Sequence, residues 1–343
     1  MLLIDAAQIH IGGALVLLEL LIKKLLSVDV QFVIIIDKRC TSQTVKSVTH
    51  KLISESYLNR KAIYKKIVNK YDIDVILSFN SFSPPYKFHG VKTITYFHNP
   101  NLLSNSNFEK ASLRYKFFQN LKRLYLKQKL KNTDYYVFQS NLILNQFIRE
   151  YSFDRKKCLI LPFYDDELLN EVVKYNYDKE CNTFCYISIP YSHKNHTILL
   201  DVWEKLLNDG LNPILKLTIP KEYISLLSRI SEMNHKGANI VNLGMIPPIE
   251  ALKYTGKSQF CIFPSLSESL GLGLVEAQKL GCKIIASDLP YVKEVVKPSI
   301  SFDPNNLIDI KEKVKYAIAK SEQIPNSELV LENRLSELIA FIK

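Results

Sequence analysis

Two glutamates, Glu268 and Glu276, are separated by seven residues in a segment that is suited to binding a phosphorylated ligand. An apolar run ends at Phe263, a loop with glycines follows, and a helix is expected to begin near Gly271. The free N–H groups and the macrodipole at a helix start bind a diphosphate without a metal. A carboxylate can accept both hydroxyls of a ribose, which we expect of Glu276, while Glu268 is expected to face a sugar that is being transferred.

The spacing of these two glutamates, taken alone, is more typical of a solvated helix face. The preceding strand, the sequence Pro264-Ser265 and the downstream Asp288-Leu289-Pro290 favour a binding site instead. The residues expected to bind the ligand at this junction are Ser269, Leu270, Gly271, Leu272, Gly273 and Glu276.

The elements that must position these residues alternate between short apolar runs and longer helical segments. In the first half the expected strands cover residues 2–4, 32–36, 75–77, 93–97 and 135–138. In the second half they cover residues 184–189, 214–219, 240–243, 260–263 and 283–286. This alternation predicts an α/β fold with two doubly wound parallel sheets. A turn-rich stretch over 162–177 is expected to link them, and an apolar periodic segment over 327–342 to form a terminal helix.

Composition agrees with two globular domains in a reducing compartment. The chain has 343 residues, about twice a typical domain, with 47% hydrophobic and 23% charged residues, which excludes a disordered chain. None of the six cysteines forms a C-x2-C pair, so we expect free thiols and a cytoplasmic protein. The apolar stretch over 11–22 is too short to span a membrane and is expected to form an ordinary helix.

The glutamate segment resembles family 4 of the glycosyltransferases, retaining enzymes of the GT-B fold whose hallmark is two glutamates separated by seven residues. Gly244 before Pro247 resembles the family's loop that packs on the base, and Asp288-Leu289-Pro290 its next strand-to-helix junction. The resemblance implies two Rossmann-like domains with an interdomain cleft. The expected domains are 1–165 on the acceptor side, 166–326 for the nucleotide-sugar donor, and a terminal helix over 327–343 that packs back on the first domain.

The resemblance also assigns residues outside the glutamate segment. It places Lys194 against the donor diphosphate and His98 against the transferred sugar, although Ile189 stands where the family usually has an arginine. A histidine in this position could also belong to the core. Gly12 and Gly13 are expected to let backbone approach the donor or acceptor. His193 and His196 have the spacing of a metal pair, but no carboxylate or cysteine lies near them in sequence, so no metal is expected.

The net charge of +11 is confined to one half of the chain. Residues 1–170 hold 25 basic and 14 acidic side chains, whereas residues 171–343 hold 20 of each. Seven basic residues lie within 113–131, a segment expected to form a basic amphipathic helix. This helix is either an ordinary solvated face or a patch for an anionic membrane near a lipid-linked acceptor.

The resemblance implies transfer of a sugar, with retention, from a nucleoside diphosphate sugar to a glycan hydroxyl, as in a lipid-linked bacterial surface polysaccharide intermediate. Glu268, His98 and Lys194 are the expected catalytic residues, and metal independence is expected because no carboxylate cluster lies near the diphosphate site. The alternatives are a nucleotide-sugar epimerase of the same fold and a basic nucleic-acid-binding protein. The second is disfavoured because no nucleic-acid-binding motif accompanies the charge.

Overall fold

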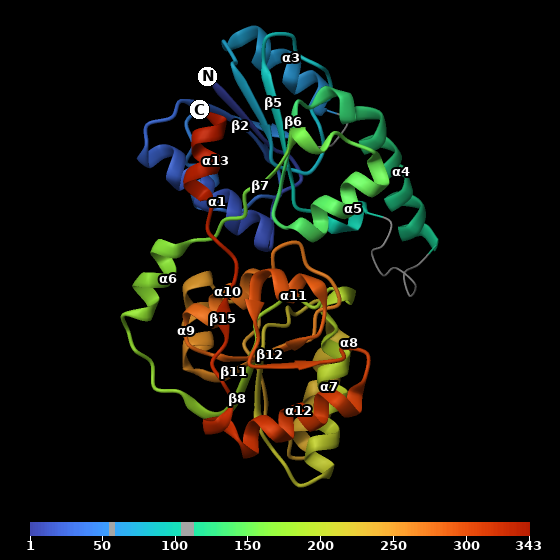
Figure 1. Cartoon of the computed structure of the whole chain (residues 1–343), viewed down its shortest axis with the longest axis vertical. Coiled ribbons are helices and arrows are strands. Elements are labelled where there is room, and N and C mark those ends of the chain that lie inside the picture. The colour runs from blue at the N-terminus through green and yellow to red at the C-terminus, as the bar shows by residue number, and fades with distance from the viewer. Residues whose placement is uncertain (55–58, 104–112) are drawn as a thin grey trace. The chain divides into compact units, whose positions relative to one another are not determined.

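The computed structural model describes residues 1–54, 59–103 and 113–343 (Figure 1). The chain divides into two compact units. The N-terminal unit comprises residues 1–165 and 332–343, and the C-terminal unit comprises residues 166–331. Each unit is an α/β structure built on its own parallel sheet.

The N-terminal sheet has seven parallel strands in the order β3-β2-β1-β4-β5-β6-β7. Its strands are β1 (Leu2–Ala6), β2 (Phe32–Asp37), β3 (Lys51–Ser54), β4 (Val75–Ser78), β5 (Lys92–Phe97), β6 (Tyr135–Phe138) and β7 (Cys158–Ile160). Its helices are α1 (Gly13–Ser27), α2 (Gln43–Lys46), α3 (Arg60–Lys70), α4 (Leu113–Lys129), α5 (Asn141–Tyr151) and α13 (Leu335–Ile342).

The C-terminal sheet has six parallel strands in the order β10-β9-β8-β11-β12-β14. They are β8 (Glu180–Tyr186), β9 (Ile214–Leu217), β10 (Ile240–Asn242), β11 (Ser258–Phe263), β12 (Lys283–Ser287) and β14 (Ile300–Phe302). A separate antiparallel pair joins β13 (Val296–Lys297) to β15 (Glu328–Leu329). The helices are α6 (Asp166–Val173), α7 (His196–Asn208), α8 (Ile224–His235), α9 (Pro248–Lys257), α10 (Leu272–Lys279), α11 (Pro290–Val295) and α12 (Leu307–Ala319).

The central strands are largely apolar because helices cover both of their faces. Every residue of β1, β2 and β4 is buried. In the C-terminal unit Phe184 of β8 stacks on Phe260 of β11, with ring centroids 4.7 Å apart, and packs against the buried Trp203 of α7. These contacts hold the two middle strands, which carry the candidate site, in a fixed register.

Several element boundaries differ from the sequence prediction. The strand predicted over 184–189 is β8, which ends at Tyr186 because Ser188 bonds to the Thr218 side chain rather than to the ladder. The short strands β3, β7 and β14 were not predicted; β3 is partly exposed, so its apolar pattern is weak. The predicted linker over 162–177 contains the helix α6.

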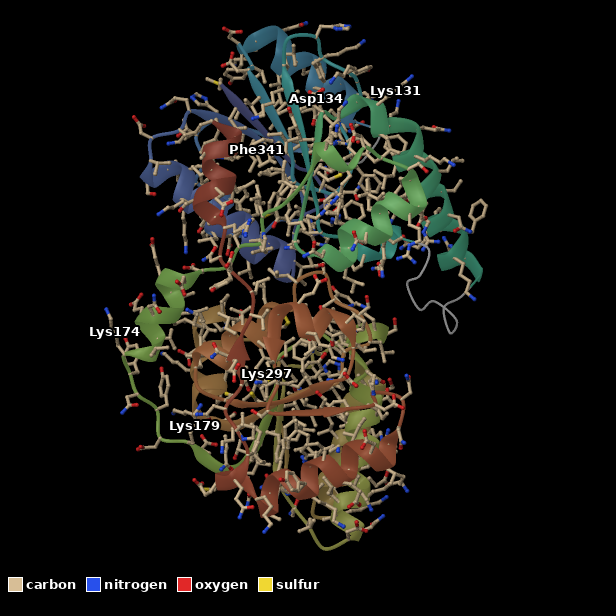
Figure 2. The ribbon with its side chains drawn as sticks, in the orientation of Figure 1. Lys131, Asp134, Lys174, Lys179, Lys297 and Phe341 are labelled. Atoms are coloured by element: carbon tan, nitrogen blue, oxygen red, sulfur yellow. The ribbon has the colours of Figure 1, made fainter. Side chains whose placement is uncertain are left out.

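The predicted terminal helix over 327–343 is wrong in its first part. Residues 328–329 form β15, and the helix α13 begins only at Leu335, whose N–H donates to the Asn333 side-chain oxygen at 3.3 Å. The helix lies in the N-terminal unit, where Phe341, labelled in Figure 2, contacts Tyr135 with ring centroids 5.2 Å apart.

Candidate functional site

The strand order of the C-terminal sheet reverses between β8 and β11, and such a switch point is where doubly wound sheets bind ligands. The loops that follow these two strands are bonded to each other. The N–H of Leu266 donates to the His193 carbonyl at 2.8 Å, and the Asn195 side chain donates to the Pro264 carbonyl at 3.4 Å. The two loops therefore form one surface at the carboxyl edge of the sheet.

Lys194 and Glu268 form an ion pair on this surface. The Lys194 Nζ donates to the Glu268 Oε1 at 2.6 Å, and these side chains are 18% and 11% exposed. The hydroxyl of Ser265 donates to the same Oε1 at 2.6 Å, and the Tyr186 hydroxyl lies 2.7 Å from the Ser265 oxygen. Tyr186 and Ser265 are both buried, so they fix the position of the glutamate from beneath.

This ion pair retains capacity for a ligand. Both hydrogen bonds of the Glu268 carboxylate use Oε1, and Oε2 has no hydrogen-bond partner among the described residues. An ammonium has three N–H donors, of which Lys194 uses one for the glutamate. The structure thus brings together two residues that the sequence assigned separately to a diphosphate and to a sugar.

The helix α10 begins beside this pair. Gly271 is its N-cap with φ of 73°, a left-handed conformation that favours glycine. A Cβ at Gly273 would lie 3.1 Å from the Phe263 ring, so this glycine also allows the helix to pack on β11. Leu270 is buried, so only its backbone can face a ligand, while Ser269 and Leu272 are partly exposed. The first-turn N–H groups of α10 are thus available at the switch point.

Glu276 lies one turn into α10 and is partly buried. Burial, with a smaller contribution from the nearby Cys185, raises the pKa of its carboxyl to about 7. The Glu276 carboxylate has no hydrogen-bond partner among the residues that the structure describes. A carboxylate held in this way is destabilised until it meets hydrogen-bond donors, such as the hydroxyls of a ribose.

The two histidines of the β8 loop have different environments. His196 is in the core, its ring Nε2 lies 3.2 Å from the Ser188 carbonyl, and burial lowers its pKa to about 4. His193 lies beside Tyr191, with nearly parallel rings whose centroids are 6.0 Å apart. In the described part of the chain, no group of three or more His, Cys, Asp and Glu side chains is arranged to hold a metal ion.

Gly244 follows β10 at the same edge of the sheet, two strands away from β8. Its φ is 65°, and its N–H donates to the Asn242 side chain at 3.2 Å. Sequence reasoning did not assign Tyr186 or Tyr291 to the site and noted Ser265 only as part of the Pro264-Ser265 sequence. These three residues build the floor of the site; the Tyr291 hydroxyl donates to the Ser265 carbonyl at 2.7 Å. Tyr186 ends β8 and Ser265 follows the end of β11, so polar residues at the ends of apolar strands were the signal for these two, whereas Tyr291 lies in α11.

The N-terminal unit holds the remaining predicted residues. His98 follows β5; its N–H donates to the Ser81 hydroxyl at 3.1 Å, and its ring Nε2 donates to the Phe79 carbonyl at 2.8 Å in the neutral tautomer. Burial lowers the pKa of His98, which keeps the ring neutral and leaves Nδ1 as an acceptor. Gly12 has φ of 74° and is the N-cap of α1, which begins at Gly13.

The switch point of the N-terminal sheet, between β1 and β4, is filled by a buried ionic network. Asp5 of β1 pairs with Arg60 of α3, and both are at most 1% exposed. Asp5 also accepts from the Tyr64 hydroxyl at 2.8 Å and from the Asn80 side chain at 3.0 Å. Arg60 donates further to the Phe82 and Ser83 carbonyls. These groups satisfy one another, so the network holds the β4 loop that in turn bonds His98.

Residues 170–328 match the family described as "Glycosyl transferases group 1". The Staphylococcus aureus protein "Capsular polysaccharide biosynthesis glycosyltransferase CapH" is 28% identical over 163 residues, which is 46% of this chain and 44% of that protein. The chain therefore aligns with less than half the length of this curated relative.

Solved structures match across the whole chain. Sucrose-phosphate synthase from Thermosynechococcus elongatus has a TM-score of 0.68 at 14% identity, over 100% of this chain and 94% of that one. Anabaena HepE in complex with UDP and glucose has a TM-score of 0.65 at 13% identity, over 100% and 95%. The fold is the two-domain α/β fold of GT-B glycosyltransferases, and the matches together support a glycosyltransferase.

Proposed function

We propose that this protein transfers a sugar, with retention of anomeric configuration, from a nucleoside diphosphate sugar to a hydroxyl of a glycan. The observation that carries the proposal is the Lys194–Glu268 pair beside the start of α10, at the switch point of a sheet. This segment lies inside the match to the glycosyltransferase family. HepE, a structural neighbour, was solved with UDP-glucose, which supports a uridine nucleotide as the first donor to test.

Each residue has a role that follows from its chemistry. The N–H groups at the start of α10 and the Lys194 ammonium stabilise the leaving diphosphate, which is the dominant electrostatic contribution to rate. The free Oε2 of Glu268 accepts a hydroxyl of the transferred sugar, and the neutral His98 ring orients that sugar. Glu276 accepts the ribose hydroxyls. Gly12, Gly13 and Gly244 let backbone approach the substrates.

The diphosphate is neutralised without a metal in this account. The helix start and Lys194 supply the positive charge that Mg²⁺ would otherwise provide. Turnover should therefore be unchanged in EDTA. Loss of turnover in EDTA, with recovery on adding a divalent ion, would contradict this part of the proposal.

The donor can be identified by a thermal-stabilisation screen of nucleoside diphosphate sugars, because a ligand that binds only the native state raises its stability. The product then decides between reaction types. A glycosylated acceptor with the donor's anomeric configuration, read by NMR, supports the proposal. An epimerised sugar with free nucleotide would identify an epimerase, and an inverted product would exclude retention.

We also propose that the acceptor is a lipid-linked polysaccharide intermediate at the cytoplasmic face of an anionic membrane. Support comes from the similarity to a capsular polysaccharide enzyme, the basic N-terminal half, and six free thiols, which suit a reducing compartment. Among the described residues, none of the helices is long and apolar enough to cross a bilayer. Extraction of native membranes at high pH should release the protein.

A further inference from the structure

The helix α4 exposes large apolar side chains. Phe117, Phe118, Leu121 and Leu124 are 60%, 50%, 45% and 53% exposed. At the helical period of 3.6 residues, Phe117, Leu121 and Leu124 share one face, with Phe118 at its side. Solvated helices usually place polar residues there, so this apolar face needs an explanation.

The opposite face of α4 attaches the helix to the N-terminal unit. Leu126 and Gln119 are buried, and the Arg123 guanidinium donates to the Leu103 carbonyl at 2.5 Å and the Asn101 carbonyl at 3.4 Å. Figure 1 shows α4 along the outside of this unit, beyond α5. The inward face is thus already used for folding, and the apolar outward face is not.

The charge of α4 selects its partner. Residues 113–131 contain seven basic and no acidic side chains. Exposed basic residues flank the apolar face, namely Arg114, Lys122, Lys127 and Lys131. A second copy of the chain would bring two such helices into repulsion, whereas an anionic bilayer attracts the charges and accepts the apolar side chains.

We propose that α4 lies in the plane of an anionic lipid bilayer and inserts Phe117, Phe118, Leu121 and Leu124 below the headgroups. The proposed function gives this contact its purpose, which is access to a lipid-linked acceptor. Docking by charge alone would be abolished by salt, because exposed charges are screened over about 8 Å at physiological ionic strength. Insertion of the apolar side chains adds binding free energy that salt does not remove, because the burial of apolar surface is not screened by ions.

Vesicle sedimentation of the full chain tests this proposal. The probes are vesicles of phosphatidylglycerol with phosphatidylcholine, and of phosphatidylcholine alone, at low and at high salt. The apolar variant combines Phe117→Ser, Leu121→Ser and Leu124→Ser. The charge variant combines Arg114→Gln, Lys122→Gln and Lys127→Gln, and leaves out Arg123 because that residue is bonded inward. A control, Ile308→Ser, removes a side chain of the C-terminal unit that is 54% exposed.

The wild type and the control should bind anionic vesicles and retain part of that binding at high salt. The apolar variant should bind about tenfold more weakly and lose the salt-resistant part, while the charge variant should lose about tenfold at low salt. Unchanged binding by the apolar variant, with circular dichroism showing a folded protein, would overturn the proposal. So would a wild-type dimer in solution that the apolar variant abolishes. Turnover with a water-soluble acceptor tests the enzymatic function separately.

Discussion

The two sheets have the same kind of switch point but use it in opposite ways. Between β1 and β4 the crevice is filled by Asp5 and Arg60, which are fully buried and bonded on all sides. Between β8 and β11 the corresponding pair, Lys194 and Glu268, is partly exposed and keeps free donors and one free oxygen. The topology provides a place for a ligand in both units, and the side chains decide whether that place is occupied by protein.

This difference separates structural from functional ion pairs. A buried pair whose partners are all internal is costly to break, because a lone charge is left in a low dielectric. A pair that water can reach, such as Lys194 and Glu268 at 18% and 11% exposed, costs less to break, because water solvates the remaining partner. Breaking the Asp5–Arg60 pair should therefore lower stability the more, and breaking the Lys194–Glu268 pair should lower activity the more.

Arg60→Met should have the largest effect on stability. It leaves Asp5 unpaired in the core and should lower the free energy of unfolding by about 3–5 kcal/mol. The matched control is Lys297→Met, which breaks a pair with Glu328 whose side chains are 72% and 68% exposed, and it should cost less than about 1 kcal/mol. Urea unfolding followed by circular dichroism measures both. Equal costs would mean that burial does not distinguish the pairs.

Lys194→Met should have the largest effect on catalysis. Loss of a cation at the leaving diphosphate should lower kcat/KM by about a hundredfold, with a smaller loss of stability than Arg60→Met causes. Glu268→Gln should mainly lower kcat. The control is Lys253→Met, which breaks an exposed pair with Glu250 in the same unit. Steady-state kinetics with the identified donor distinguishes these variants; a wild-type rate for Lys194→Met would exclude its role.

Glu276→Gln should change how stability depends on pH. The pKa of Glu276 is raised from 4.5 to about 7, so the folded protein holds this proton more tightly than the unfolded chain does. The resulting stabilisation is fully present below pH 4.5 and is lost as pH rises through 7. The uncharged variant should therefore be more stable than wild type at pH 8 by about 1–3 kcal/mol and equal to it near pH 4. Glu276→Ala should weaken donor binding. Identical pH–stability profiles for wild type and Glu276→Gln would contradict this placement.

Gly273→Ala should have the smallest effect. The added Cβ would lie 3.1 Å from the Phe263 ring and must displace it slightly, while alanine favours the helix. The two effects should nearly offset each other, with a change in stability within about 1 kcal/mol. Gly271→Ala, at a positive φ, should cost more. Thermal unfolding compares the two variants, and a larger cost at Gly273 would mean that packing outweighs backbone strain here.

The sequence predicted the α/β class and most strands because buried parallel strands are continuous apolar runs. It placed Glu268, Glu276 and Gly271 at a strand-to-helix junction, and the structure has β11 and α10 on either side of that loop. It could not predict the Lys194–Glu268 pair, because 73 residues of chain separate the two positions and only the sheet brings them together. It also missed Arg60, which lies on a helix face that looks solvated in sequence.

Donor titration by calorimetry tests whether the open switch point of the C-terminal unit binds a nucleoside diphosphate sugar. The donor would be the best stabiliser from the thermal screen, titrated into wild type, Lys194→Met and the control Lys253→Met. Wild type and Lys253→Met should bind equally, and Lys194→Met should bind at least about tenfold more weakly. Equal binding by all three, or no binding of any nucleoside diphosphate sugar by wild type, would contradict the proposed donor site.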